Sequence, residues 1–170
     1  MTEEEDPAAL DSEGAAALLG RLMLAWDGQW FLKVAQSCGL EKAVELNARV
    51  RTSFGRIEIR EYLKALGLRR AASVEQAARL LNRYGKLFLR DGMQAEWTVA
   101  ENGVEIAVSR CLPQEGAAKA GLKADTPCVA CETVWEAWLE TALPGTEWTT
   151  EVRCAMGRGD RKCLIIVNRK

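Results

Sequence analysis

The spacing of apolar residues changes at Asp91-Gly92, and this change limits the folds open to the chain. Before this point, apolar side chains recur at steps of three and four residues, as in amphipathic helices. After it, they alternate every second residue in two stretches, as in strands with one buried face. The sequence therefore predicts a helical first half followed by a unit that contains a sheet.

Four helices are expected before residue 91, after an acidic stretch at residues 1–13 that predicts a mobile tail. Gly39 stands where a C-terminal cap is typical, and Gly55 is expected to end the second helix. Ser73 followed three residues later by Gln76 is a capping-box pattern, which predicts the start of the fourth helix. The predicted helical ranges are 14–38, 40–53, 56–65 and 73–85.

Two hairpins and one helix are expected after residue 91. Asn102-Gly103 lies between two alternating stretches and is a strong signal for a hairpin turn. Thr126-Pro127 places a capping residue before a proline suited to the first helical position. The predicted strands are 93–100, 104–111, 148–155 and 162–168, and the helix is 126–142. This order predicts an α+β fold, with a helical N-terminal unit (14–90) followed by an α+β unit (91–170) that has an antiparallel sheet and a packed helix.

The charges of the chain nearly balance, with 23 Lys and Arg against 24 Asp and Glu. Nucleic-acid-binding domains usually carry a basic surface, so DNA or RNA binding is not expected. No apolar run approaches the roughly 18 to 20 residues that span a membrane, and the acidic start is unlike that of a signal peptide. We therefore expect a cytoplasmic protein. In the reducing cytoplasm, clustered cysteines bind metal or do redox chemistry more often than they form disulfides.

Four of the six cysteines form two close pairs, Cys128 with Cys131 and Cys154 with Cys163. The first pair would lie in the first turn of the helix 126–142, and the second would close the two ends of the last hairpin loop. Since the chain has no histidine, a transition metal would depend on thiolate sulfur. The pattern predicts a structural zinc site with these four ligands, and Cys111 could replace one of them.

Other interpretations of the same cysteines remain open. An iron-sulfur cluster also takes four thiolates, a dithiol can act as a redox sensor, and free cysteines are often ordinary core residues. On a regular strand, Cys154 would share a face with Trp148, Thr150 and Val152.

The stretch from Glu151 to Val167 contains Glu-x-x-Cys and Gly-Asp-x-x-Cys motifs that end at Cys154 and Cys163. It resembles the terminal signature of the 4-vinyl reductase-type small-molecule-binding domains. That resemblance implies a zinc ion near Glu151, Cys154, Cys163 and an earlier cysteine, Cys128 or Cys131. The loop between the two cysteines is one residue longer than usual, and Glu151 would face away from Cys154 unless a bulge intervened. We therefore expect four cysteines rather than three with a glutamate.

A second resemblance covers the first half of the chain. Residues 26–31 (Trp-Asp-Gly-Gln-Trp-Phe), 39–43 and 54–58 are similar to proteins grouped with the aminothiazoline carboxylate hydrolase-like family. This similarity implies a hydrolase of a small thiazoline-like carboxylate as an alternative function. Without histidine, the nucleophile would be Cys111 or Cys128, with Asp27, Glu132 or Glu136 as acid or base.

The favoured function is a small-molecule-binding module with a structural zinc site, and its ligand is expected to be a small apolar molecule or a carboxylate. The first resemblance implies a pocket between sheet and helix, for which Trp97, Trp135 and Trp138 are the candidate lining residues. The apolar stripe of the first helix, with Trp26 and Trp30, could pack internally or form the seam of a homodimer.

Overall fold

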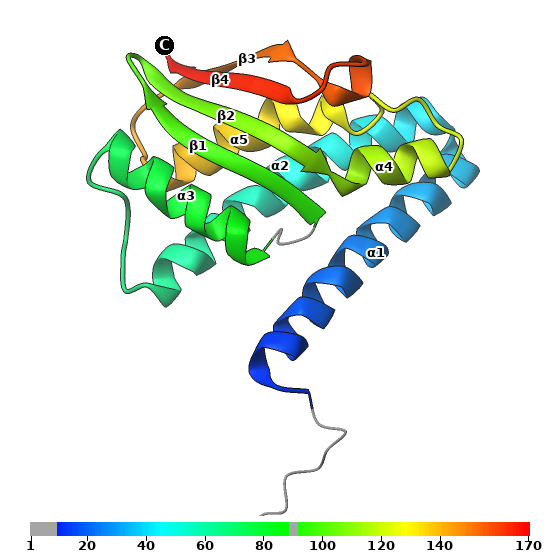
Figure 1. Ribbon diagram of the computed structural model, residues 1–170, viewed down its shortest axis with the longest axis horizontal. Coiled ribbons are helices and arrows are strands. Elements are labelled where there is room, and N and C mark those ends of the chain that lie inside the picture. The colour runs from blue at the N-terminus through cyan, green and yellow to red at the C-terminus, as the bar shows by residue number, and fades with distance from the viewer. Residues whose placement is uncertain (1–9, 89–91) are drawn as a thin grey trace, which may run out of the picture.

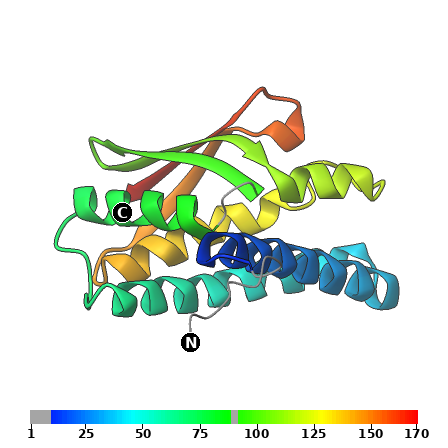
Figure 2. The same ribbon diagram turned by 60° about the horizontal axis from the view of Figure 1, so that its bottom comes forward.

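A four-stranded antiparallel sheet lies over a set of helices (Figures 1 and 2). The computed structural model describes residues 10–88 and 92–170. The elements are α1 (Ser12–Cys38), α2 (Leu40–Ala65), α3 (Val74–Phe88), β1 (Met93–Ala100), β2 (Gly103–Cys111), α4 (Leu112–Lys119), α5 (Cys128–Ala142), β3 (Trp148–Cys154) and β4 (Cys163–Arg169). The strand order is β1-β2-β4-β3, which confirms the expected α+β class.

The helices are arranged on one side of the sheet. α3 packs against β1 and α5 against β3, while α2 packs on α5 and α1 lies along α2. Figure 2 shows the sheet above these helices, and Figure 1 shows the N-terminal half of α1 extending away from the other elements. The hydrophobic core draws its buried residues from α2, α3, α5 and all four strands, so both predicted units contribute to it.

The start of α1 follows from a local cap. Asp11 accepts a hydrogen bond from the backbone N–H of Gly14 at 2.7 Å, which satisfies a donor that the helix itself leaves free. The predicted tail at 1–13 lies mostly outside the described residues, and α1 begins at Ser12, two residues earlier than expected.

The expected break at Gly55 is wrong, because α2 runs without interruption from Leu40 to Ala65. A Cβ atom at position 55 would lie 2.9 Å from Nε1 of Trp138 and 3.2 Å from Cγ2 of Val134. The glycine is therefore needed for the close approach of α5 rather than to end the helix. The local sequence alone predicts a helix end at Gly55, because glycine lowers helix propensity whether it ends a helix or allows close packing within one.

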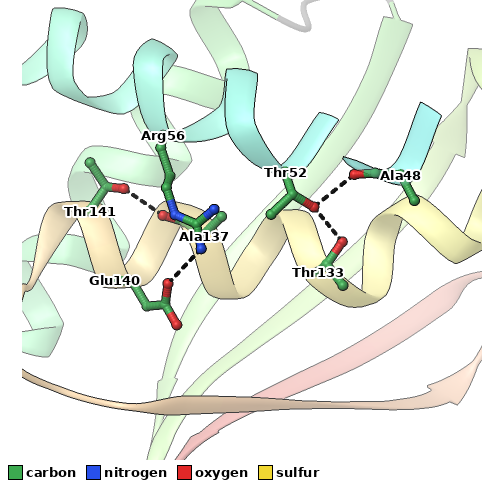
Figure 3. A network of polar contacts seen from close by, with 7 residues as sticks. All are labelled: Ala48, Thr52, Arg56, Thr133, Ala137, Glu140 and Thr141. Carbon is green, nitrogen blue, oxygen red and sulfur yellow. Dashed lines mark hydrogen bonds and ion pairs between the residues drawn. The ribbon is translucent and has the colours of Figure 1, made fainter. Parts of the chain in front are cut away.

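The contact between α2 and α5 is reinforced by polar groups along its solvent side, as Figure 3 shows. The hydroxyl oxygens of Thr52 and Thr133 lie 2.6 Å apart, and Arg56 donates to Glu140 at 3.1 Å. Each of these exposed contacts adds little stability, so the buried apolar surface between the helices supplies most of it.

The two helix starts predicted from capping residues differ in outcome. The cap at Ser73 is confirmed, because its hydroxyl accepts from the N–H of Gln76 at 3.3 Å. Gln76 accepts from the N–H of Ala72 at 2.6 Å instead of that of Ser73, so the second bond of the capping box is displaced by one residue. The helix α5 begins at Cys128, with Pro127 in the cap position, so the start predicted at residue 126 is two residues too early.

The sheet register is regular except at two positions, and the second one matters for the cysteines. The hairpin between β1 and β2 turns at Asn102-Gly103 as predicted. In the pair β3 and β4, Val152 is opposite Ile165 but Cys154 is opposite Leu164, so Arg153 forms a bulge. Since neighbouring residues on β4 face opposite sides, the bulge turns Cys154 away from the face that Val152 occupies.

Candidate functional site

Two adjoining cavities lie where α1, α2, α4 and α5 meet the ends of β2 and β4. We call the first the inner cavity. It has a volume of about 100 Å³ and is lined mainly by apolar side chains of α5 and the sheet, including Val134, Trp135 and Ile165. The outer cavity has a volume of about 500 Å³ and lies between α1 and α4. Both cavities are lined by Leu24, Asp27, Asn47, Pro113 and Pro127, so they share a boundary.

Four cysteines line the inner cavity: Cys111 from the end of β2, Cys128 and Cys131 from the first turn of α5, and Cys163 from the start of β4. All six cysteines of the chain are free thiols. Cys163 Sγ also accepts a hydrogen bond from the N–H of Met156 at 3.3 Å, which holds the loop between β3 and β4 against this strand. Three of the four predicted metal ligands are thus gathered here, joined by the predicted substitute Cys111.

Cys154 does not line this cavity. Because of the bulge at Arg153, it shares a face with Leu164 and Glu151, whereas Cys163 shares a face with Ile165. The expectation that Cys154 shares a face with Trp148, Thr150 and Val152 is therefore wrong. Within residues 10–88 and 92–170, no three His, Cys, Asp or Glu side chains are grouped so that they could hold a metal ion. The four predicted sulfur ligands are accordingly not assembled around one point.

Burial raises the pKa values of three cavity thiols, those of Cys111, Cys128 and Cys131. The pKa of Cys111 rises to about 11. Mutual repulsion among the thiols adds to this effect, and the charge of Arg158 or Arg51 opposes it only in part. Since the thiolate is the nucleophile, Cys111 and Cys128 are not activated for attack in this arrangement. They behave as small apolar groups that line the cavity.

The predicted ligand-binding tryptophans form one aromatic cluster, only part of which reaches the cavity. Trp135 and Trp138 line the inner cavity, and their rings meet edge to face with centroids 5.1 Å apart. Trp97 packs behind them, with its centroid 5.5 Å from that of Trp135 and 6.2 Å from that of Trp138. Trp97 is therefore a support for the cavity wall rather than part of its lining.

The carboxylates suggested for catalysis have separate positions. Only Asp27 lines the cavities. Glu132 is exposed and forms an ion pair with Arg158 at 3.5 Å, and Glu136 accepts from the backbone N–H of Thr150 at 2.7 Å, which ties α5 to β3. The structure therefore brings one of the three acid or base candidates to Cys111 and Cys128.

Asn47 and Arg51 are cavity residues that sequence reasoning missed. They lie one turn apart on α2 and both line the inner cavity. They belong to a row in which Ala43, Gly55 and Ile59 are buried at four-residue spacing. Two polar residues in such a row were the available signal, because a polar residue in a core-facing row often marks a site.

A family comparison covers most of the chain, since residues 16–158 match the model of a family of unknown function, DUF6125. The chain belongs to this family. None of the curated proteins compared with the sequence matches it. The two resemblances expected from the sequence are not tested by these findings and stay hypotheses.

Solved structures show that the fold recurs in two proteins with very different sequences. A trafficking protein particle complex subunit 3 from Naegleria fowleri, covalently bound to palmitic acid, superimposes with a TM-score of 0.60 at 15% identity, over 91% of this chain and 96% of that one. The phenol-responsive sensory domain of the transcription activator PoxR, in complex with phenol, gives 0.57 at 13% identity, over 91% of this chain and 74% of that one.

The described residues contain no helix that is both long and apolar enough to cross a membrane. The expectation about nucleic acid is not tested by the geometry of the cavities.

Proposed function

We propose that this protein is a small-molecule-binding module whose ligand occupies the inner cavity and extends into the outer one. The observation that carries the proposal is the pair of adjoining cavities at the meeting point of helices and sheet. Their lining is mainly apolar, with polar side chains at the shared boundary (Asp27, Asn47), in the inner cavity (Arg51) and around the outer one (Arg21, Glu115, Lys119). Ligand sites in proteins typically have this composition and, at several hundred Å³, this size. Both solved neighbours carry a small molecule or acyl chain, which is consistent with the proposal.

Toluene is a suitable first probe, because cavities of similar size lined by apolar side chains bind single aromatic rings. We expect saturable shifts of amide NMR signals from the residues around the cavity and a rise in thermal stability with toluene concentration. The variant Ala130→Leu places extra methyl groups in the inner cavity and should weaken binding. The control Ala118→Leu, on α4 and outside both cavities, should bind as the parent does. Absence of saturable binding, or equal binding by Ala130→Leu, contradicts the proposal.

A metal centre stays a separate prediction. Zinc or an iron-sulfur cluster at Cys128, Cys131, Cys154 and Cys163 requires Cys154 to turn across β3, and Cys111 is the cysteine that already lies with the other three. Elemental analysis of the purified protein tests it: about one zinc per chain, or iron with visible absorbance, supports a centre.

The thiol redox sensor and the thiazoline carboxylate hydrolase remain alternative functions. The hydrolase is tested by incubation with a thiazoline carboxylate and detection of ring opening. A cytoplasmic location also remains a prediction.

The possible homodimer has support from α1, which has no buried residue along its length. Leu19, Leu22 and Trp26 lie on one side of it at helical spacing and are 63%, 55% and 64% exposed. Exposed apolar rows of this kind often mark protein interfaces. A homodimer through α1 predicts twice the chain mass in light scattering and a monomer for Leu22→Glu, with Arg21→Glu as the control. A monomeric parent protein contradicts it.

A further inference from the structure

The inner cavity has a polar side that its apolar lining does not explain. On α2, Ala43, Gly55, Ile59 and Leu63 face the interior and are buried. Asn47 and Arg51 continue the same row but carry an amide and a guanidinium instead of an apolar group. Both line the inner cavity, and Asn47 also lines the outer one.

Neither group is satisfied by the described part of the chain. Oδ1 of Asn47 is buried and has no hydrogen-bond partner there. Arg51 is half-buried, and among the described residues it makes no hydrogen bond or ion pair. Two other arginines of the same helix do: Arg49 pairs with Glu45 at 3.7 Å and Arg56 with Glu140 at 3.1 Å. Since buried polar groups in proteins are almost always hydrogen-bonded, a polar group of a bound molecule would supply the partner that the described residues do not give this pair.

The charges around Arg51 indicate the sign of that group. Asp27 lines both cavities from α1 but forms no ion pair with Arg51 within 4.0 Å. Glu58 lies further along α2; burial raises the pKa of its carboxyl, and the charge of Arg51 lowers it only in part. Burial therefore works against a full negative charge on Glu58, and no carboxylate of the described residues forms an ion pair with the guanidinium. Its planar fork of donors suits a carboxylate, which it can hold by two parallel hydrogen bonds.

We propose that Arg51 and Asn47 are the polar anchor of the site and select a small apolar molecule that carries one carboxylate. The carboxylate meets Arg51 and the amide of Asn47, while the apolar body lies among the thiols of Cys128 and Cys131 and the ring of Trp135. A doubly charged phosphate is disfavoured, because a single arginine in an apolar cavity compensates only part of its charge. The inference rests on the proposed function, since it assumes that the cavity binds a small molecule.

Four compounds with the same ring separate the two proposals: toluene, benzyl alcohol, benzylamine and benzoate, each titrated by amide NMR. Benzoate should bind the parent protein about tenfold or more tightly than toluene, because hydrogen bonds to charged groups contribute more than neutral ones. Arg51→Gln should weaken benzoate by about the same factor and leave toluene within about twofold. Arg60→Gln, an exposed arginine of the same helix outside both cavities, should change neither affinity.

Arg51→Lys is a second variant that separates loss of the anchor from a folding defect, since it keeps the positive charge but loses the planar fork of donors. It should bind toluene normally and benzoate at an intermediate strength. If toluene binds but benzoate binds no more tightly, or if Arg51→Gln affects both compounds equally, the polar anchor is wrong and the binding module stands. Preference for benzylamine or benzyl alcohol over benzoate overturns the anchor in the same way. If none of the four compounds binds, both proposals fail.

Discussion

Gly157 lies where two segments of the cavity wall touch, and replacing it with alanine tests that wall. It belongs to the 3-10 turn η2 (Met156–Arg158) between β3 and β4, and it lines the inner cavity. A Cβ atom here would lie 2.7 Å from the carbonyl oxygen of Ala124 and 2.7 Å from Cα of Asp125. Both neighbours are backbone atoms of the segment that leads into α5, so no side chain can rotate away. One of the two segments has to move.

The size of the effect follows from two opposing contributions. Overpacking of a close contact costs about 1 to 3 kcal/mol, and the upper part of this range applies because the contact is with backbone. Alanine also restricts the unfolded chain, which stabilises by about 0.4 to 1 kcal/mol. We therefore expect Gly157→Ala to lower the free energy of unfolding by about 1 to 2 kcal/mol, or the melting temperature by about 2 to 8 °C in a chain of this length. Toluene and benzoate should both bind more weakly, since Pro127 and Cys128 follow the displaced segment.

Urea unfolding followed by far-UV circular dichroism measures this change, with Gly116→Ala as the matched control. Gly116 lies within α4, and a Cβ atom there has no heavy-atom neighbour within 4 Å. Its replacement should stabilise the protein by up to about 1 kcal/mol through helix propensity. Equal stabilisation by Gly157→Ala and Gly116→Ala would refute the reasoning, because it would show that the two segments do not touch closely.

Two further substitutions test the packing of α2. Gly55→Ala should lower the free energy of unfolding by about 1 to 2 kcal/mol in the same urea assay, because its Cβ meets Trp138 and Val134. The control Gly85→Ala should not destabilise, since a Cβ atom there has no neighbour within 4 Å. A stabilised Gly55→Ala would show that α2 and α5 can move apart freely. Glu58→Gln should stabilise the protein at pH 7, because burial raises the pKa of the Glu58 carboxyl and so disfavours its ionised form in the folded state. Since both states of the parent become protonated below the ordinary glutamate pKa of about 4.3, the advantage should shrink as the pH falls to that value; an advantage independent of pH would contradict the assignment.

Local sequence patterns were sufficient for most of the elements. The alternation in β1 and β2, the turn at Asn102-Gly103 and the helix cap at Ser73 each depend on residues close in the chain, and each is found as expected. The class of the fold follows from their order. Positions whose role depends on residues distant in the chain could not be predicted in this way. Gly55 is explained by its contact with Trp138, which belongs to a different helix.

The cysteines show the same division. The sequence located Cys128 and Cys131 in the first turn of a helix and Cys163 at a strand start, and these positions follow from local signals. The bulge at Arg153 depends on how β3 pairs with β4, and periodicity alone could not reveal it. It turns Cys154 to the face of Glu151, while the end of β2 brings Cys111 to the other three thiols.

The strongest argument for a ligand comes from comparing the exceptions within one row of α2. Gly55 breaks the apolar pattern, and a single contact with Trp138 accounts for it. Asn47 and Arg51 break the same pattern, but the described residues give Asn47 Oδ1 no hydrogen-bond partner and Arg51 no ion-pair partner. Folding alone would favour apolar residues at both positions, since unpaired polar groups lower stability. A polar group of a bound molecule would supply the interaction that the fold leaves out, and proteins commonly accept such local costs at their functional sites.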